Sequence, residues 1–124
     1  MQFINFLRDI DEDNLLSRCY FPTEDLKKFG LQHLTEANAQ LRPAAFSDFM
    51  LFELGRYQLW QAEADKGFKY IPRRLRIPLQ TAVDMYNWTG RVIAEDPHVV
   101  FKDKIKPRKR RVLSRAILNV ALAG

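Results

Sequence analysis

A row of polar side chains near the start of the chain has the residue types of a metal or phosphate site. Gln2, Asn5, Asp9 and Asp13 follow one another at spacings of three, four and four residues. On a helix this spacing places them on one face, with the two carboxylates roughly 5–6 Å apart at their β-carbons. Carboxylates this close repel each other. Magnesium relieves that repulsion, because it takes one or two carboxylates and fills its other positions with water and phosphate oxygens.

The residues around this row leave two interpretations open. Asn5 adds a neutral oxygen, and Arg8 lies beside the row, where it could bind a phosphate or pair with Glu12 one turn later. Apolar residues surround most of the segment, as in a buried helix: Phe3, Ile4, Phe6, Leu7 and Ile10. An acidic run is more often a solvent-exposed helix face, and spacing alone does not separate a metal–diphosphate site from such a surface.

The elements that must position the row are helices. Apolar residues recur at helical spacing in several segments, and no alternating strand pattern persists for six residues. The fold class predicted is therefore all-α. Thr23 is expected to cap a helix that Gly30 terminates, and prolines are expected at three helix starts. The predicted helices are 2–15, 23–29, 35–41, 43–67, 78–94 and a last helix starting near Pro107.

Two predicted helices have stripes that we expect to pack in the core. The stripe of the 43–67 helix contains one polar residue, Glu53, among Phe46, Met50, Tyr57, Trp60 and Ala64. The apolar face of the last helix consists of Val112, Leu113, Ala116, Ile117, Val120 and Ala121. Some aromatic rings could instead line a cavity, although core packing is the more ordinary role for Phe3, Phe6, Phe46, Phe49, Tyr57 and Trp60.

Composition indicates one globular domain. The chain has 124 residues, of which 47% are hydrophobic and 28% charged, and these values argue against disorder or low complexity. Its apolar stretches are far shorter than the roughly 20 residues of a membrane-spanning helix, and no signal-peptide pattern opens it. The single cysteine, Cys19, excludes an intrachain disulfide and a paired-cysteine metal site. We therefore expect a cytoplasmic protein.

Charge is unevenly distributed along the chain. Residues 1–62 have a net charge of −3 and residues 63–124 a net charge of +8. Such a basic cluster attracts polyanions. Solvated surface or peripheral contact with anionic lipid is expected here; nucleic acid is not an expected partner, because no recognition motif is visible and few aromatics interleave with the bases. The cluster comprises Lys102, Lys104, Lys106, Arg108, Lys109, Arg110, Arg111 and Arg115.

The first 22 residues resemble the second aspartate-rich motif of squalene and phytoene synthases. That family pattern is Q-x-x-N-x-x-R-D-x-x-E-D, then a short spacer and R-x-Y-[LF]-P. Every fixed position is filled here, from Gln2 to Asp13 and from Arg18 to Pro22. A looser resemblance continues to the end of the chain. Of the two types in this family, we expect the chain to be closer to the phytoene synthases than to the squalene synthases.

The resemblance implies part of an isoprenoid-synthase-type helical bundle and a magnesium-dependent prenyltransferase, with manganese as an alternative ion. Phytoene synthases condense two geranylgeranyl diphosphates head to head through a cyclopropyl diphosphate intermediate, in carotenoid biosynthesis. The implied metal ligands are Asn5, Asp9 and Asp13, and the implied catalytic residues are Asp9, Asp13 and Arg8. The implied substrate-binding residues are Gln2, Asn5, Arg8, Arg18, Tyr20, Tyr86 and Lys104, the last standing where arginine is more typical.

The chain departs from the family in length. Family members are more than twice as long and have a first aspartate-rich motif upstream, whereas residues 14–124 contain no further D-x-x-x-D pair. We therefore expect residues 1–124 to form the C-terminal part of a synthase domain, inactive alone and partnered by the N-terminal half. Two alternatives stay open: a squalene- or dehydrosqualene-type synthase using farnesyl diphosphate, and an inactive helical fragment or partner subunit.

Overall fold

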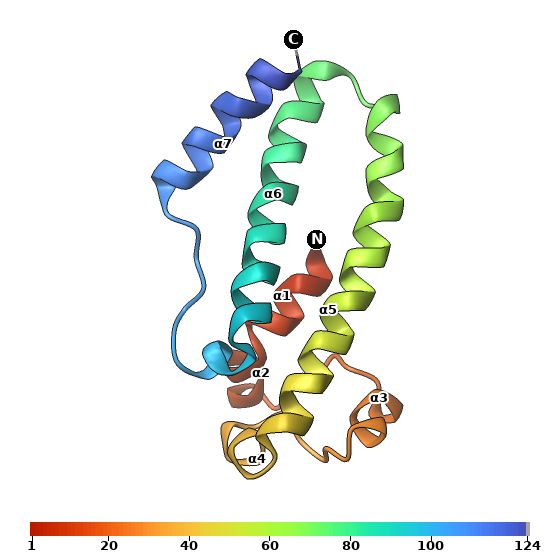
Figure 1. Ribbon diagram of the computed structural model, residues 1–124, viewed down its shortest axis with the longest axis vertical. Coiled ribbons are helices and arrows are strands. Elements are labelled where there is room, and N and C mark those ends of the chain that lie inside the picture. The colour runs from red at the N-terminus through yellow and green to blue at the C-terminus, as the bar shows by residue number, and fades with distance from the viewer. Residues whose placement is uncertain (124) are drawn as a thin grey trace.

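The computed structural model describes residues 1–123, and every regular element within them is helical, which confirms the all-α prediction. Two long antiparallel helices, α5 (Pro43–Asp65) and α6 (Arg73–Glu95), form the framework of the molecule (Figure 1). The first helix, α1 (Gln2–Arg8), lies between them and contacts both. The last helix, α7 (Lys109–Leu122), packs along the other side of α6.

Shorter helices connect and close one end of this framework. Three of them, α2 (Ile10–Leu15), α3 (Thr23–Lys28) and α4 (Glu36–Leu41), gather at the lower end in Figure 1, where the 3₁₀ helix η2 (Pro97–Phe101) also lies. A second 3₁₀ helix, η1 (Lys66–Tyr70), extends α5 toward the turn into α6. Within residues 1–123, no helix is both long and apolar enough to cross a bilayer.

The hydrophobic core lies where α1, α5 and α6 meet the short helices. Ile4, Leu7, Phe49, Met50 and Ile93 are fully buried there. Between α5 and α6, the hydroxyl of Tyr57 donates a 2.9 Å hydrogen bond to Asn87 Oδ1. Burial raises the pKa of Tyr57 to about 12, so this hydroxyl stays a protonated donor.

The N-terminal segment is two helices joined by a kink, and the prediction of one helix over 2–15 is wrong. Asp9 has φ −101° and ψ 19°, and this ψ departs from the helical value of about −42°. Helical hydrogen bonds nevertheless continue through the kink. The amide of Asp9 donates to the carbonyl of Asn5, and that of Asp13 to the carbonyl of Asp9, both at 2.8 Å. The predicted row therefore keeps its spacing.

Two predicted helix starts are corrected, and a third is confirmed. Thr23 makes no capping hydrogen bond and is itself the first residue of α3, after Pro22. α6 starts at Arg73 rather than near Pro78, because Pro72 initiates it through hydrogen bonds from Leu75 and Arg76 to its carbonyl. Pro78 lies inside this helix and removes one backbone donor. α7 starts at Lys109, after the extended Arg108, which confirms the predicted start near Pro107.

Two predicted stripes are only partly correct. On α5, the predicted members Phe46, Met50, Glu53 and Tyr57 are buried, but Trp60 is 57% exposed, and Gln61 takes the buried position beside it. On α7 the predicted members Val112 and Ala116 are partly buried, but the rest of the predicted face is wrong. Leu113, Ile117 and Val120 are exposed, and the buried residue of this helix is Asn119. The reason is that the α7 side facing α6 meets polar partners there, as described below.

Glu53 is a fully buried carboxyl group, and its partners come from two helices. Arg56 Nη1 donates to both Glu53 oxygens, at 3.0 and 3.3 Å, and to Asp25 Oδ2 of α3 at 2.7 Å. Burial, then a hydrogen bond with Asp25, raises the pKa of Glu53 to about 7. The hydrogen bond from Arg56 lowers the pKa of Asp25. The cluster holds α3 against α5.

We predict that this cluster makes stability depend on pH. Because its folded pKa is raised, Glu53 stabilises the fold at low pH, and this contribution is lost as the pH rises from 4.5 to about 7. The loss is up to about 3 kcal/mol of unfolding free energy. Asp25 acts oppositely, and its contribution is lost as the pH falls below 3.8. Urea denaturation at a series of pH values measures both windows.

The matched variants are Glu53→Gln and Glu63→Gln, which alter a buried and an exposed glutamate of the same helix. Glu53→Gln should flatten the upper window, whereas Glu63→Gln should keep it. An unchanged pH profile in Glu53→Gln would show that the titration of Glu53 is not the cause.

Candidate active site

The predicted row lies on the side of the N-terminal segment opposite its core contacts. Ile4 and Leu7 are completely buried and fix the rotation of α1 about its axis. Asn5, Asp9 and Asp13 are each partly exposed, so they are neither in the core nor fully in solvent. Gln2 is exposed at the start of the row and accepts a 3.4 Å hydrogen bond from Asn5 Nδ2.

One member of the row holds an unpaired buried oxygen. The Oδ1 atom of Asn5 is inaccessible to solvent and has no hydrogen-bond partner within residues 1–123. A buried acceptor without a partner costs about 1–3 kcal/mol. Hard oxygen atoms of this kind are what Mg²⁺ binds, and the two aspartates supply more of them. The donor set of Asn5, Asp9 and Asp13 therefore fits a magnesium or manganese ion.

This donor set is incomplete by itself. Among the described residues, no three histidine, cysteine, aspartate or glutamate side chains form a group that could hold a metal. A hard cation at two carboxylates takes its other ligands from amide oxygens, water or phosphate. The row therefore suits an ion that a phosphate group shares, rather than one caged by protein.

The two aspartates differ in their electrostatic surroundings. Asp9 is held by Arg8, whose Nε and Nη2 donate to the two carboxylate oxygens at 2.7 and 2.8 Å. That hydrogen bonding raises the pKa of Arg8, and nearby Tyr86 and Glu12 contribute to a smaller extent. The pKa of Asp13 is raised by burial first and by the charge of Asp9 second. This direction agrees with the repulsion expected from the spacing of the two side chains.

A residue from far along the chain completes the charged cluster. Lys104 follows η2 and donates from Nζ to Glu12 Oε1 of α2 at 2.8 Å. Both side chains are about 60% exposed, so solvent screens the pair and it adds little to the stability of the fold. The pair nevertheless brings Lys104 beside Asp9 and Arg8, whose charges also act on its pKa.

The pairing of Arg8 with Glu12, one of the two sequence alternatives, does not form. Arg8 takes Asp9 instead, and Glu12 takes Lys104. Sequence reasoning missed this role of Glu12, because 92 residues separate it from its partner and no local pattern indicates the contact.

The second part of the motif lies against the first. A narrow cleft of about 10 Å³ is lined by Asp13, Arg18, Tyr20 and Phe6, among others. Tyr20 stacks on Phe6 with ring centroids 4.3 Å apart and an interplanar angle of 12°. The positive charge of Arg18 acts on Asp13 and partly offsets its raised pKa. The cleft has room for about one water molecule, so these side chains form a packed wall.

The structure thus brings most predicted site residues together. Arg8, Asp9 and Lys104 form one charged group with the phenol of Tyr86 near Arg8, and Asp13 continues it toward Arg18 and Tyr20. The aromatic residues considered as cavity walls fall into two groups. Phe46 and Phe49 are buried core residues, whereas Phe3 and Phe6 are partly exposed. Phe3 packs edge-on against Trp60 at 5.1 Å.

Comparison with known proteins identifies the family. The family model described as squalene/phytoene synthase matches residues 1–115. This chain belongs to the squalene/phytoene synthase family. A 15-cis-phytoene synthase of Synechocystis is 31% identical over 100 residues, which are 81% of this chain and 29% of the relative. A 15-cis-phytoene synthase of Synechococcus elongatus is 27% identical over 103 residues, 83% of this chain and 33% of the relative.

A relative of another type matches a shorter part. A presqualene diphosphate synthase of Zymomonas mobilis is 41% identical over 63 residues, 51% of this chain and 19% of the relative. The chain spans about a third of the length of the phytoene synthases it matches. No solved structure matches it significantly.

We predict that Asp9→Asn lowers the pKa of Asp13, because the substitution removes the neighbouring negative charge while burial of Asp13 remains. Carbon NMR of the Asp13 carboxyl group, followed through a pH titration, measures this shift. Asp11→Asn removes an exposed carboxylate of the same helix outside the row and should leave the Asp13 pKa unchanged. Equal shifts of the Asp13 pKa in the two variants would contradict the specific interaction of Asp9 with Asp13.

Proposed function

We propose that this chain is part of a divalent-metal-dependent prenyltransferase of the phytoene synthase type, and that it contributes the second aspartate-rich motif. The observation that carries the proposal is the row of Asn5, Asp9 and Asp13, held opposite the buried Ile4 and Leu7. Membership of the squalene/phytoene synthase family supports it. The proposed reaction is the head-to-head condensation of two geranylgeranyl diphosphates through a cyclopropyl diphosphate intermediate, in carotenoid biosynthesis.

The proposed metal ligands are Asn5, Asp9 and Asp13, directly or through water. The buried, unpartnered Oδ1 of Asn5 and the repulsion between the two carboxylates both favour a cation at this place. When bound, magnesium or manganese would neutralise the charge that develops on the departing diphosphate. Asp13 must be ionised for this role, so its raised pKa makes metal binding weaken as the pH falls.

The cationic side chains beside the row are the proposed diphosphate contacts. Arg8 presents a planar guanidinium that suits bidentate binding of phosphate oxygens, whereas Lys104 acts as a point charge. Each is paired with a carboxylate, Arg8 with Asp9 and Lys104 with Glu12. If a metal ion takes Asp9, the guanidinium of Arg8 can bind phosphate instead. Gln2 and Tyr86 are proposed as further polar contacts, and Arg18 and Tyr20 as the wall behind Asp13.

The type of substrate is proposed from the relatives. The two 15-cis-phytoene synthases align with more than four fifths of this chain, and this favours the phytoene type. A farnesyl diphosphate substrate is the second candidate, because the presqualene diphosphate synthase aligns with about half of the chain at higher identity. The first aspartate-rich motif is proposed to come from the remaining N-terminal part of the synthase, the partner that these residues require.

We predict that the chain binds Mn²⁺, a spectroscopic substitute for Mg²⁺, and that Asp9→Asn and Asp13→Asn each weaken this binding at least about tenfold. The expected loss follows from the removal of one charged oxygen ligand. Electron paramagnetic resonance of free Mn²⁺ in a protein titration measures the affinity.

Asp11→Asn is the matched control, because Asp11 is exposed on the same helix but outside the row. It should bind Mn²⁺ as the unmodified chain does. Binding that is equally weak in all three variants would mean diffuse attraction to the acidic run and would overturn the proposed site.

We further predict that the isolated chain does not turn over geranylgeranyl diphosphate with magnesium, because one aspartate-rich motif holds the diphosphate from one side only. Release of pyrophosphate, measured with a coupled assay, tests this. Turnover by the chain alone would refute the need for a second motif. Turnover restored by the N-terminal half of a family member, and lost again with Asp13→Asn, would favour an enzyme portion over an inactive helical partner.

A further inference from the structure

The contact between α7 and α6 contains a polar cluster, beside which Val112 and Ala116 of α7 are partly buried. Asn119 is the buried residue of α7, and its Nδ2 donates to Thr81 Oγ1 at 3.1 Å and to Asp84 Oδ2 at 2.9 Å. Arg115 Nε donates to the same Asp84 oxygen at 3.0 Å. Three hydrogen bonds therefore fix which side of α7 faces the rest of the protein.

The opposite side of α7 is apolar and exposed. Leu113 and Ile117 are each 63% exposed, and Val120 is 50% exposed. These residues follow Arg110 at spacings of three, four and three, so all four share one face of the helix. A helix at a water-facing surface normally places its apolar stripe inward. On α7 only the smaller Val112 and Ala116 are partly buried, whereas the larger Leu113 and Ile117 are exposed and need a cover.

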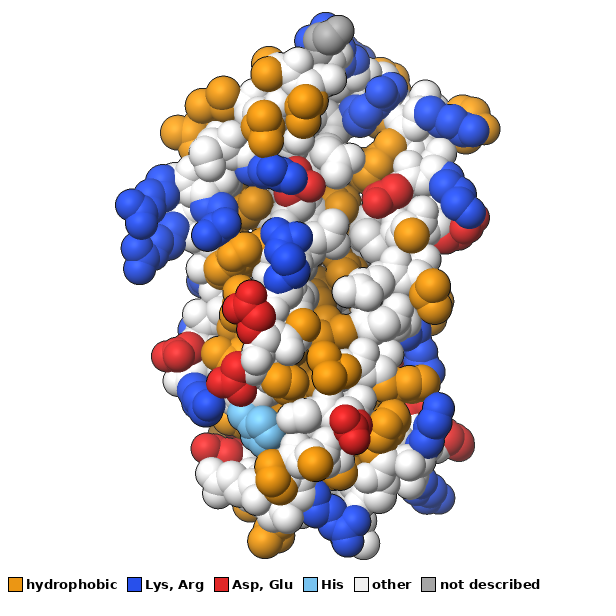
Figure 2. Space-filling view, in the orientation of Figure 1, with side chains coloured by type: hydrophobic (Ala, Val, Ile, Leu, Met, Phe, Trp, Pro, Cys, Tyr) orange, Lys and Arg blue, Asp and Glu red, His pale blue; other side chains and the backbone are white. Residues whose placement is uncertain are grey.

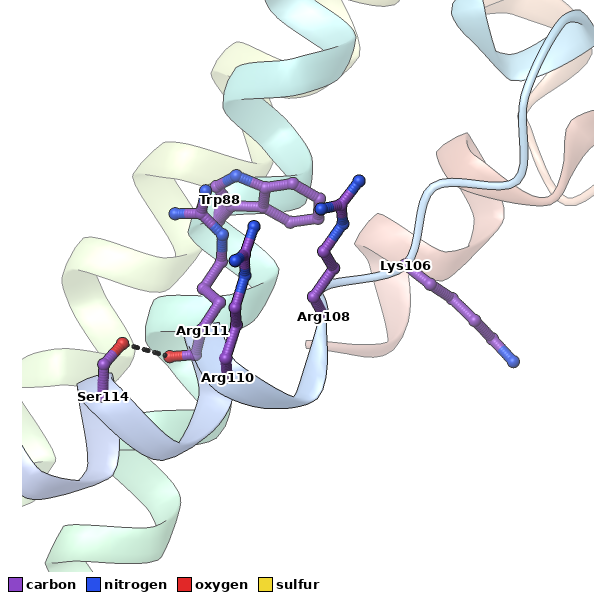
Figure 3. A pocket seen from close by; sticks show the side chains of 6 residues that line it. All are labelled: Trp88, Lys106, Arg108, Arg110, Arg111 and Ser114. Carbon is purple, nitrogen blue, oxygen red and sulfur yellow. Dashed lines mark hydrogen bonds between the residues drawn. The ribbon is translucent and has the colours of Figure 1, made fainter.

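The beginning of α7 carries a concentration of positive charge. Lys106, Arg108, Arg110 and Arg111 surround an open hollow of about 660 Å³, together with Trp88 of α6 and Ser114 (Figure 3). Arg111 lies over the indole ring of Trp88, 5.0 Å from its centroid. Within residues 1–123, these four bases form no ion pair with an acid.

This charge stands where a helix disfavours it. The N-terminus of a helix carries a partial positive charge, so cations in its first turn are repelled and anions are favoured. The first turn of α7 contains Lys109, Arg110 and Arg111 and no acid. From Lys104 to Ala123 the sequence has seven bases and no acidic residue. An anionic partner would offset both the mutual repulsion of these bases and the unfavourable helix dipole.

We propose that the outer face of α7 docks on an anionic lipid bilayer. The bases around the hollow would bind lipid phosphates, while Leu113, Ile117 and Val120 would enter the boundary between headgroups and acyl chains. Trp88 suits the same boundary, because its indole ring combines an apolar body with one polar donor. Figure 2 shows basic and apolar side chains side by side over α7.

A single binding partner must account for both the basic residues and the exposed apolar residues of this face. A nucleic acid would satisfy the arginines but would leave the exposed leucine and isoleucine uncovered. An apolar protein surface, that of an N-terminal half of the synthase included, would cover Leu113 and Ile117 but would leave the bases without counter-charge. An anionic bilayer supplies phosphate and hydrocarbon together, in adjacent layers. The proposal uses no residue of the aspartate row, so it stands or falls independently of the proposed enzymatic function.

The test is flotation of the purified chain with lipid vesicles. We expect binding to vesicles of phosphatidylcholine mixed with phosphatidylglycerol, and little binding to phosphatidylcholine alone. Raising the salt concentration should weaken the binding, because salt screens attraction to the surface. Lys109→Gln with Arg110→Gln should weaken it by roughly 25-fold. Leu113→Ser with Ile117→Ser should weaken it by at least about tenfold.

The matched control is Lys27→Gln with Lys28→Gln, which removes two exposed bases from α3 at the other end of the molecule (Figure 1). This variant should bind vesicles as the unmodified chain does. The substituted positions are exposed, and circular dichroism of each variant checks that the fold is kept.

Three results would overturn the proposal. The first is no binding of the unmodified chain to anionic vesicles at low salt. The second is full binding by the Leu113→Ser, Ile117→Ser variant, which would reduce the effect to non-specific charge attraction. The third is self-association of the chain that this variant abolishes, without any vesicle binding, which would assign the apolar face to a second copy.

Discussion

The rotation of the first helix about its own axis is the constraint on which the rest of the candidate site depends. Ile4 and Leu7 are completely excluded from solvent between α5 and α6, and a rotation of α1 would expose them to water. Full burial of such a side chain is worth about 1.5–3 kcal/mol. The apolar side of α1 therefore determines where its polar side points, although the apolar residues themselves take no part in the chemistry.

The charged groups near the row form an interlocking set. Arg8 satisfies Asp9, and Lys104 satisfies Glu12 across 92 residues of sequence, while Asp13 is left with a raised pKa. The group with the unfavourable surroundings is thus the Asp13 carboxyl, and Asn5, whose Oδ1 is unpaired, belongs to the same helical row two turns earlier. A bound cation would stabilise both the Asp13 carboxylate and the unpaired oxygen, because it attracts negative charge. This agrees with the function proposed for this family member.

Polar groups inside the fold have a different role from those of the site. Glu53 is buried with Arg56 and Asp25, and Asn119 with Thr81 and Asp84. Each set ties one helix to another at a defined rotation, since a buried polar group without its partner costs about 1–3 kcal/mol. In α7 the polar contact also affects which residues lie on the protein surface. The polar contact occupies part of the inner side of the helix, and Leu113, Ile117 and Val120 are left on the surface.

The sequence by itself determined the helical class, the spacing of the aspartate row, the burial of Glu53 and the family. These features depend on residues a few positions apart, or on a motif that is contiguous in the chain. Only the tertiary structure decided four other features. These are the kink at Asp9, the start of α6 ahead of Pro78, the pairing of Glu12 with Lys104 and the exposed apolar face of α7. Local periodicity predicted that Leu113, Ile117 and Val120 of α7 face inward, because it measures which residues share a face and not what that face meets. Thr81 and Asp84 lie more than 30 residues away on α6, and they select Asn119 instead.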